Sequence, residues 1–98
     1  MDETSVIGKV RDNPVLHRFE LQTELGLAVA EYRWDDGKLA IYHTEVPRAL
    51  RGRGIGEILV RGMFEHVRHR NLKVIPLCWF VREVVNSYPE YRELLVVG

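Results

Sequence analysis

The glycine-rich stretch from Val46 to Gly56 (VPRALRGRGIG) constrains this chain more than any other segment. A strand-like run over residues 39–46 enters it, and a helix-like run from Ile55 to Arg70 leaves it. A glycine turn between a strand and a helix aims successive backbone N–H groups into one concavity, and the positive end of the helix dipole faces the same place. Such a turn favours an anion, most often a phosphate.

The spacing of the glycines narrows the choice of ligand. A dinucleotide-binding loop needs G-x-G-x-x-G, and a P-loop needs Gly-Lys-Ser/Thr at its end. Gly52, Gly54 and Gly56 are followed by Glu57 and satisfy neither pattern. What remains is Arg-x-x-Gly-x-Gly beginning at Arg51. Two other interpretations stay open at this point: a tight turn that serves only helix packing, and an Arg-Gly segment that contacts RNA.

Composition limits the class of protein. Ninety-eight residues predict one domain, residues 1–98. The formal net charge of zero argues against nucleic-acid or membrane partners held by broad electrostatic attraction. Cys78 is the single cysteine, so no internal disulfide can form, which is typical of a reducing compartment. The acidic, polar residues 1–5 do not resemble a signal peptide, and no apolar run is long enough to span a membrane. We therefore expect a cytoplasmic protein, a monomer by default.

The order of elements predicts an α/β fold. Strand patterns cover residues 6–10, 15–22, 27–34 and 38–46, with turn signals at Asp12-Asn13-Pro14, at 24–26 and at Asp35-Asp36-Gly37, which indicates an antiparallel meander. The helix from Ile55 to Arg70, with Asn71 as its cap, then leads to a strand over 72–77, and a β-α-β unit makes its two strands parallel neighbours. Pro76 cannot donate to a ladder, so pairing should loosen there. Short helices follow, one from about Phe80 to Tyr88 and one from Pro89 to Leu95.

A strand, an Arg-x-x-Gly-x-Gly loop and a crossover helix in this order resemble the GNAT superfamily of acetyl-CoA-dependent N-acetyltransferases. The strings HTEVP (43–47), RGRGIG (51–56), Pro76-x-Cys78 and YPEY (88–91) are similar to its small, single-domain YjdJ-type members, over about Arg18 to Leu95. The resemblance implies a minimal GNAT-like fold whose two parallel strands splay apart around the pantetheine arm of acetyl-CoA. Trp79 departs from that pattern, because the family commonly has a small or polar residue there.

The resemblance also implies a coenzyme A site. Backbone groups of Glu45 and Val46 would pair with the pantetheine arm, and Asn86 would hydrogen-bond to it. The remaining residues of the implied site would hold the pyrophosphate or reach the ribose phosphate: Arg48, Arg51, Gly52, Arg53, Gly54, Ile55 and Gly56.

Candidate catalytic residues follow from the chemistry of amide formation. An amine must lose its proton before it attacks a thioester, so a general base helps, and His43 or Glu45 is the candidate. Cys78 lies close to the acetyl group by resemblance, either as a small hydrophobic side chain or as an acyl acceptor or acid/base group. Tyr88 and Tyr91 are either acids for the departing thiolate or core aromatics. The histidine spacing predicts no metal site, and His17, His66 and His69 are assigned no ligand role.

These observations predict an N-acetyltransferase that moves an acetyl group from acetyl-CoA to a primary amine. The acceptor could be a small molecule or a peptide, and no residue pattern selects among them. The alternative interpretation is a GNAT-like module that binds acyl-CoA without catalysis.

Overall fold

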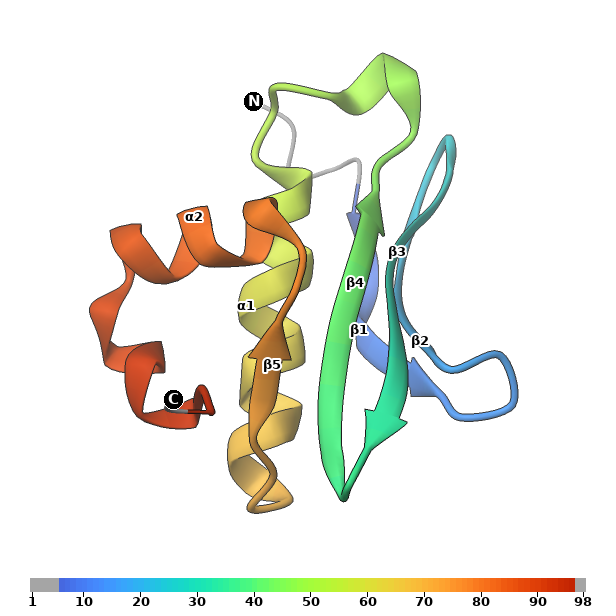
Figure 1. Cartoon of the computed structure of the whole chain (residues 1–98). Coiled ribbons are helices and arrows are strands. Elements are labelled where there is room, and N and C mark those ends of the chain that lie inside the picture. The colour runs from blue at the N-terminus through green and yellow to red at the C-terminus, as the bar shows by residue number, and fades with distance from the viewer. Residues whose placement is uncertain (1–5, 97–98) are drawn as a thin grey trace.

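A computed structural model of the chain describes residues 6–96 as a five-stranded mixed sheet with helices packed against one face (Figure 1). The strands lie in chain order and are β1 (Val6–Asn13), β2 (Arg18–Thr23), β3 (Gly26–Asp35), β4 (Lys38–Glu45) and β5 (Val74–Pro76). Strands β1 to β4 pair antiparallel, and β5 pairs parallel to β4. The predicted α/β class, with a meander that leads into a β-α-β unit, is confirmed.

Four helical segments complete the described chain: η2 (Arg48–Leu50), α1 (Ile55–His69), α2 (Trp79–Ser87) and η3 (Pro89–Leu94). Helix α1 is the crossover between β4 and β5 and buries one apolar face at helical spacing, formed by Leu59, Val60, Met63, Phe64 and Val67. Asn71 takes a left-handed φ of 56°, as expected for the residue that ends a helix.

The core lies between α1 and the sheet and continues under α2 and η3. Phe19, Tyr32 and Ile41 supply large, fully buried side chains from three strands. The Phe64 ring of α1 stacks on the Tyr91 ring of η3, with 4.8 Å between ring centroids. Tyr91 is only 3% exposed, which makes it a core aromatic residue, the second of its two predicted roles.

The boundary between β1 and β2 was predicted wrongly. The structure extends β1 to Asn13, and the predicted strand over residues 15–22 begins only at Arg18. Residues 14–17 form the turn instead, because His17 takes a left-handed φ of 53° and the Leu16 N–H donates to Asn13 Oδ1 at 3.1 Å. The turn predicted at Asp12-Asn13-Pro14 is therefore displaced toward the C-terminus.

Smaller differences occur near the C-terminus. Strand β5 covers only residues 74–76 of the predicted 72–77, and the last predicted helix is a 3-10 helix that begins at Pro89. Residues 1–5, for which no signal peptide was expected, lie outside the described residues. No helix within residues 6–96 has the length and apolar character needed to cross a membrane.

Candidate functional site

Strands β4 and β5 separate at the residue where proline was expected to loosen them. Parallel pairing joins Leu39 to Val74 and continues to Ile41 and Pro76, where it stops. The N–H groups of Leu77 and Cys78 both donate to the Ile41 carbonyl, each at 3.0 Å, so the chain turns away from β4 at this point. The predicted splay of the two parallel strands is confirmed.

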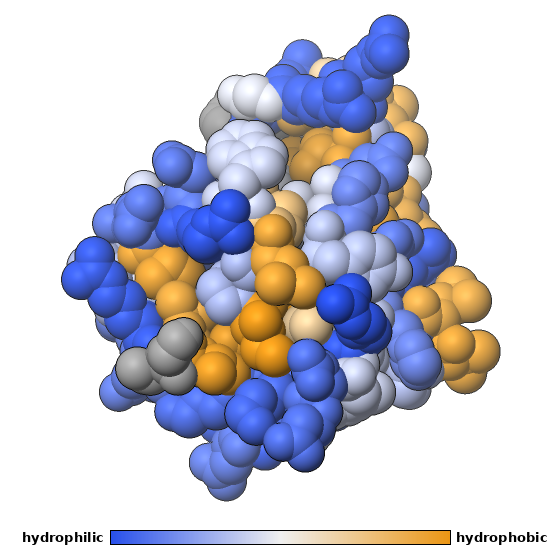
Figure 2. All heavy atoms as spheres, viewed as in Figure 1, coloured by the Kyte–Doolittle hydropathy of each residue, from blue (hydrophilic) through white to orange (hydrophobic). Residues whose placement is uncertain are grey.

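A cavity of about 860 Å³ occupies this split. Figure 2 shows it as a recess with an apolar floor beneath the loop that precedes α1. Its walls come from the end of β4, from the loop and first turn of α1, and from the start of α2: residues 42–46, Leu50, Arg51, Gly52, residues 54–57 and residues 77–80. Two stretches of the chain that are far apart in the sequence, residues 42–57 and residues 77–80, therefore meet around one open space.

The glycine loop forms one end of the cavity. Gly52 and Gly54 both have a φ of +81°, which favours glycine, and Gly54 is the N-cap of α1. The first N–H groups of a helix have no partner within the helix, so they are available to an anion. Arg51 adds a positive charge at this end and donates from Nε to the Val46 carbonyl at 3.4 Å. The loop thus has the geometry of a phosphate site.

A β-bulge at Tyr42 decides which way the end of β4 faces. On β3, Tyr32 pairs with Ile41 and Glu31 pairs with His43, so Tyr42 is an extra residue. The bulge reverses the alternation of side chains beyond Ile41. Without it, His43 would lie on the face covered by α1 and Thr44 on the open face.

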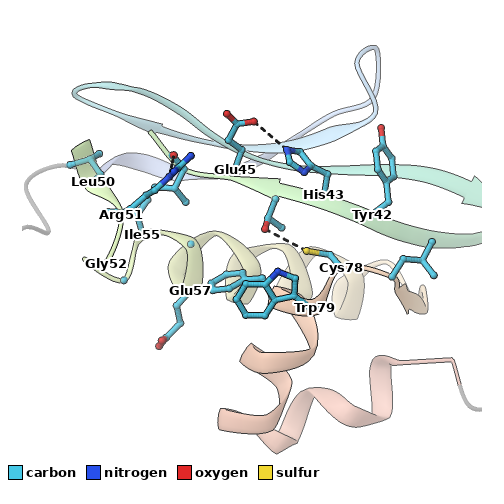
Figure 3. A pocket seen from close by; sticks show the side chains of 16 residues that line it. Tyr42, His43, Glu45, Leu50, Arg51, Gly52, Ile55, Glu57, Cys78 and Trp79 are labelled. Carbon is cyan, nitrogen blue, oxygen red and sulfur yellow. Dashed lines mark hydrogen bonds and ion pairs between the residues drawn. The ribbon is translucent and has the colours of Figure 1, made fainter. Parts of the chain in front are cut away.

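His43 and Glu45 therefore lie together on the open face of the sheet. His43 Nε2 lies 3.2 Å from Glu45 Oε1, and the two side chains are 49% and 60% exposed. Figure 3 shows both projecting from β4 on the side away from Trp79. The predicted shared parity of these two candidate bases is confirmed, and they form a contacting pair.

Thr44 faces the opposite way and reaches Cys78. Its Oγ1 lies 3.6 Å from Cys78 Sγ in a partly buried contact (Figure 3). Cys78 is the N-cap residue of α2 and is neither fully buried nor fully exposed. Sequence reasoning missed Thr44, because strict alternation from the buried Ile41 assigns Thr44 to the other face and only the bulge brings it to Cys78.

Gly56 allows α2 to approach α1 closely. A Cβ atom at this position would lie 2.9 Å from two ring atoms of Phe80 and 3.4 Å from Val46 Cγ2. Phe80 also meets the Trp79 ring edge-on, with 5.9 Å between centroids. The third glycine of the motif is therefore needed for packing at the cavity wall rather than for an unusual φ.

A second polar cluster borders the first turn of α1. The Tyr88 hydroxyl donates to Glu57 Oε2, and this hydrogen bond raises the pKa of the Tyr88 phenol. The Arg61 guanidinium lies over the Tyr88 ring, 4.0 Å from its centroid. Glu57 lines the cavity, whereas Tyr88 does not, and Figure 3 shows the Glu57 carboxylate directed away from Arg51.

The other predicted site residues lie farther out. Arg48, Arg53 and Asn86 are exposed and are not among the residues that line the cavity. In the part of the chain that the structure describes, no three His, Cys, Asp or Glu side chains are grouped as metal ligands would be. Tyr42, Leu77 and Trp79, which no motif singled out for a role, line the cavity with exposed side chains.

Comparisons with known proteins agree with this geometry. The family model for GCN5-related N-acetyl-transferase matches residues 18–94. Protein NATD1 of Homo sapiens is 40% identical over 57 residues, which are 56% of this chain and 50% of that protein. Protein NATD1 of Mus musculus is also 40% identical over 57 residues, covering 56% and 52%. The chain thus spans about half the length of the curated relatives it matches.

The fold has a counterpart among solved structures. The NMR solution structure of a GCN5-like protein from Staphylococcus aureus, a candidate N-acetyltransferase, has a TM-score of 0.67 and 26% sequence identity. The match covers 100% of this chain and 93% of that one. The YjdJ-type subfamily stays a prediction.

Proposed function

The chain belongs to the GCN5-related N-acetyltransferase family, and from this premise we propose that it transfers the acetyl group of acetyl-CoA to a primary amine. One observation carries the proposal: the split between β4 and β5 opens into a cavity that ends at the glycine loop and the first turn of α1. An elongated thioester with an anionic end matches both features of this cavity.

The coenzyme would lie along the split. Its pyrophosphate would accept hydrogen bonds from the N–H groups of the loop and the first turn of α1, with Arg51 adding charge. The pantetheine arm would run beside the backbone of Glu45 and Val46. Its thioester would then reach Thr44 and Cys78, which meet at the inner part of the cavity.

Transfer would proceed by direct attack. The amine nitrogen bonds to the thioester carbonyl carbon, and an N–H group of the Glu45–Val46 strand stabilises the oxyanion. The C–S bond then breaks, and the proton that the nitrogen loses as the amide forms goes to the departing thiolate, so coenzyme A leaves as the free thiol. His43 accepts the proton of the ammonium group, and the Glu45 carboxylate at 3.2 Å stabilises the imidazolium that forms. The Tyr88 hydroxyl donates a hydrogen bond to Glu57, so we infer that it positions that carboxylate and does not protonate the departing thiolate.

The coenzyme site is tested by charge reversal. Arg51→Glu places a carboxylate at the phosphate end and should weaken acetyl-CoA binding at least about tenfold. Arg92→Glu on η3 makes the same change in net charge at an exposed residue outside the cavity and should leave binding unchanged. Amide chemical-shift titration with acetyl-CoA measures the affinity of both variants. Equal affinities for Arg51→Glu and the unaltered chain would place the coenzyme elsewhere.

The base is tested by substitution. His43→Gln should lower kcat/KM about 10²-fold, because the glutamine side chain cannot accept the proton of the ammonium group. Thiol release from acetyl-CoA measures the rate, and the shift titration checks that the coenzyme still binds. A variant with the kcat/KM of the unaltered chain would assign the proton to another group.

One observation favours a second function, an acyl-CoA-binding module without catalysis. The four residues 14–17 join β1 to β2 as a turn, so no helix between these strands walls an acceptor pocket. Thiol release in the presence of amines separates the two functions, since a module of this kind would bind acetyl-CoA and release no thiol.

A further inference from the structure

The split between β4 and β5 has two sides with different chemistry. The glycine loop, the first turn of α1 and Trp79 lie on the side of the helices. Tyr42, His43 and Glu45 project from the other side of β4, onto the open face of the sheet (Figure 3). Because the coenzyme occupies the side that holds the loop, an acceptor has to reach the thioester from the open face.

Two large apolar side chains begin this open-face entrance. Ile41 and Pro76 are the last parallel partners, so Tyr42 and Leu77 are the first residues of the two diverging chains. Tyr42 is 45% exposed and Leu77 is 47% exposed, and both line the cavity. Figure 2 shows apolar surface continuing over β5 toward the start of α2. The entrance therefore presents exposed apolar surface from both diverging chains.

The charges around the entrance accommodate one ammonium group. Among the carboxylates that line the cavity, Glu45 is the one on the open face, where it contacts His43. Glu31 lies across from His43 on β3 and, like Arg33 and Arg82, is outside the residues that line the cavity.

Two guanidinium groups flank the apolar walls. Arg33 lies over the Tyr42 ring, 5.9 Å from its centroid, and Arg82 donates to the Pro76 carbonyl at 2.6 Å. A second or third ammonium group on the acceptor would meet these cations, and like charges placed together are unfavourable.

We propose that the acceptor is a primary amine with a single positive charge and an aromatic or bulky apolar flank, which binds between Tyr42 and Leu77 with its nitrogen directed to His43 and Glu45. This inference rests on the proposed acetyl transfer and names its substrate class. Polyamines and lysine side chains in charged peptides are disfavoured on this proposal, because they bring further positive charges toward the two arginines.

Acceptor preference tests the proposal. Thiol release is measured with phenethylamine, ethylamine, spermidine and a lysine peptide at saturating acetyl-CoA. The value of kcat/KM for phenethylamine should exceed each of the others at least about tenfold, since the ring is the added contact. Leu77→Ala should reduce the ratio of phenethylamine to ethylamine severalfold. The matched variant Leu16→Ala, in the exposed β1–β2 turn, should leave this ratio unchanged.

A binding measurement separates this proposal from the proposed function. Phenethylamine is titrated into the protein saturated with coenzyme A, which has no acetyl group to transfer, and should shift the amide signals of Tyr42 and Leu77. Such shifts without any thiol release from acetyl-CoA would support the subsite and overturn the transfer reaction. Faster turnover of spermidine or of the peptide would support transfer and overturn the acceptor class. The absence of shifts at Tyr42 and Leu77 would also overturn the acceptor class.

Discussion

The close contact of Gly56 with Phe80 predicts that a single methyl group will disable the site while leaving the protein folded. In Gly56→Ala, the new Cβ would lie 2.9 Å from Phe80 Cε2 and Cζ, so the ring has to move by about 0.5–1 Å to reach ordinary contact distance. Overpacking of this kind costs about 1–3 kcal/mol, and alanine returns about 1 kcal/mol of helix preference. The net loss of about 0–2 kcal/mol lowers Tm by up to about 15 °C.

The effect of Gly56→Ala on activity should be larger than its effect on stability. Phe80 belongs to the first turn of α2, beside Cys78 and Trp79, so its displacement moves the cavity wall. A misplacement of about 1 Å can cost 10²-fold in rate, and we expect a loss of about this size in kcat/KM for acetyl-CoA. Adding Phe80→Leu removes the ring atoms in question and should restore most of the activity.

A matched control separates packing at the site from general instability. Gly37→Ala in the β3–β4 turn has open space around its Cβ but a φ of +78°, which costs about 1–2 kcal/mol for a residue with a side chain. It should lower Tm by a similar amount and leave kcat/KM unchanged. The reasoning is refuted if Gly56→Ala keeps the kcat/KM of the unaltered chain, or if Gly37→Ala loses as much activity.

Three further predictions concern single contacts. Cys78→Ala should lower kcat/KM by less than about tenfold, because direct attack needs no thiol, and a loss of 10³ would indicate an acyl-enzyme. Tyr88→Phe frees the Glu57 carboxylate beside the phosphate end and should weaken acetyl-CoA binding severalfold in a shift titration, while Glu57→Gln in the same chain restores it. The Arg18 hydrogen bond holds the pKa of Glu20 below its ordinary value, so the unfolded chain binds the proton more readily and stability falls as pH drops below about 4.5. In urea unfolding, Glu20→Gln should reduce the acid-induced loss in the free energy of unfolding by about 0.5 kcal/mol. An unchanged dependence of this free energy on pH would contradict the assignment.

The features that the sequence predicts well are those encoded by local chemistry. The glycine loop, the amphipathic helix α1 and the strand that precedes them each have a pattern within one short window, and all three lie where they were expected. Pro76 is the clearest case, since a missing N–H predicts the end of pairing and the ladder stops at that residue. The order of these elements also sufficed to indicate the family.

The orientation of the site residues could not be predicted in the same way. Whether His43 or Thr44 faces Cys78 depends on the bulge at Tyr42, which exists only in the register between β3 and β4. Alternation is read from one strand, whereas a bulge is a mismatch in length between two strands. The β1–β2 turn was misplaced for a related reason. His17 adopts a left-handed φ, and the alternation of apolar and polar residues around it gives no sign of this conformation.

The two halves of the site depend on different kinds of structure. On the helix side, the anion end is built from backbone N–H groups and from glycines whose replacement alters φ or packing. On the open face, the proposed acceptor side is built from side chains of Tyr42, His43 and Glu45, and the extra residue Tyr42 turns His43 and Glu45 toward this face. Because the proposed coenzyme half relies on backbone N–H groups and the proposed acceptor half on exposed side chains, substitutions at Tyr42 and Leu77 should change the acceptor while the coenzyme site stays intact. Acceptor specificity is therefore the property of this fold that mutation should alter most easily.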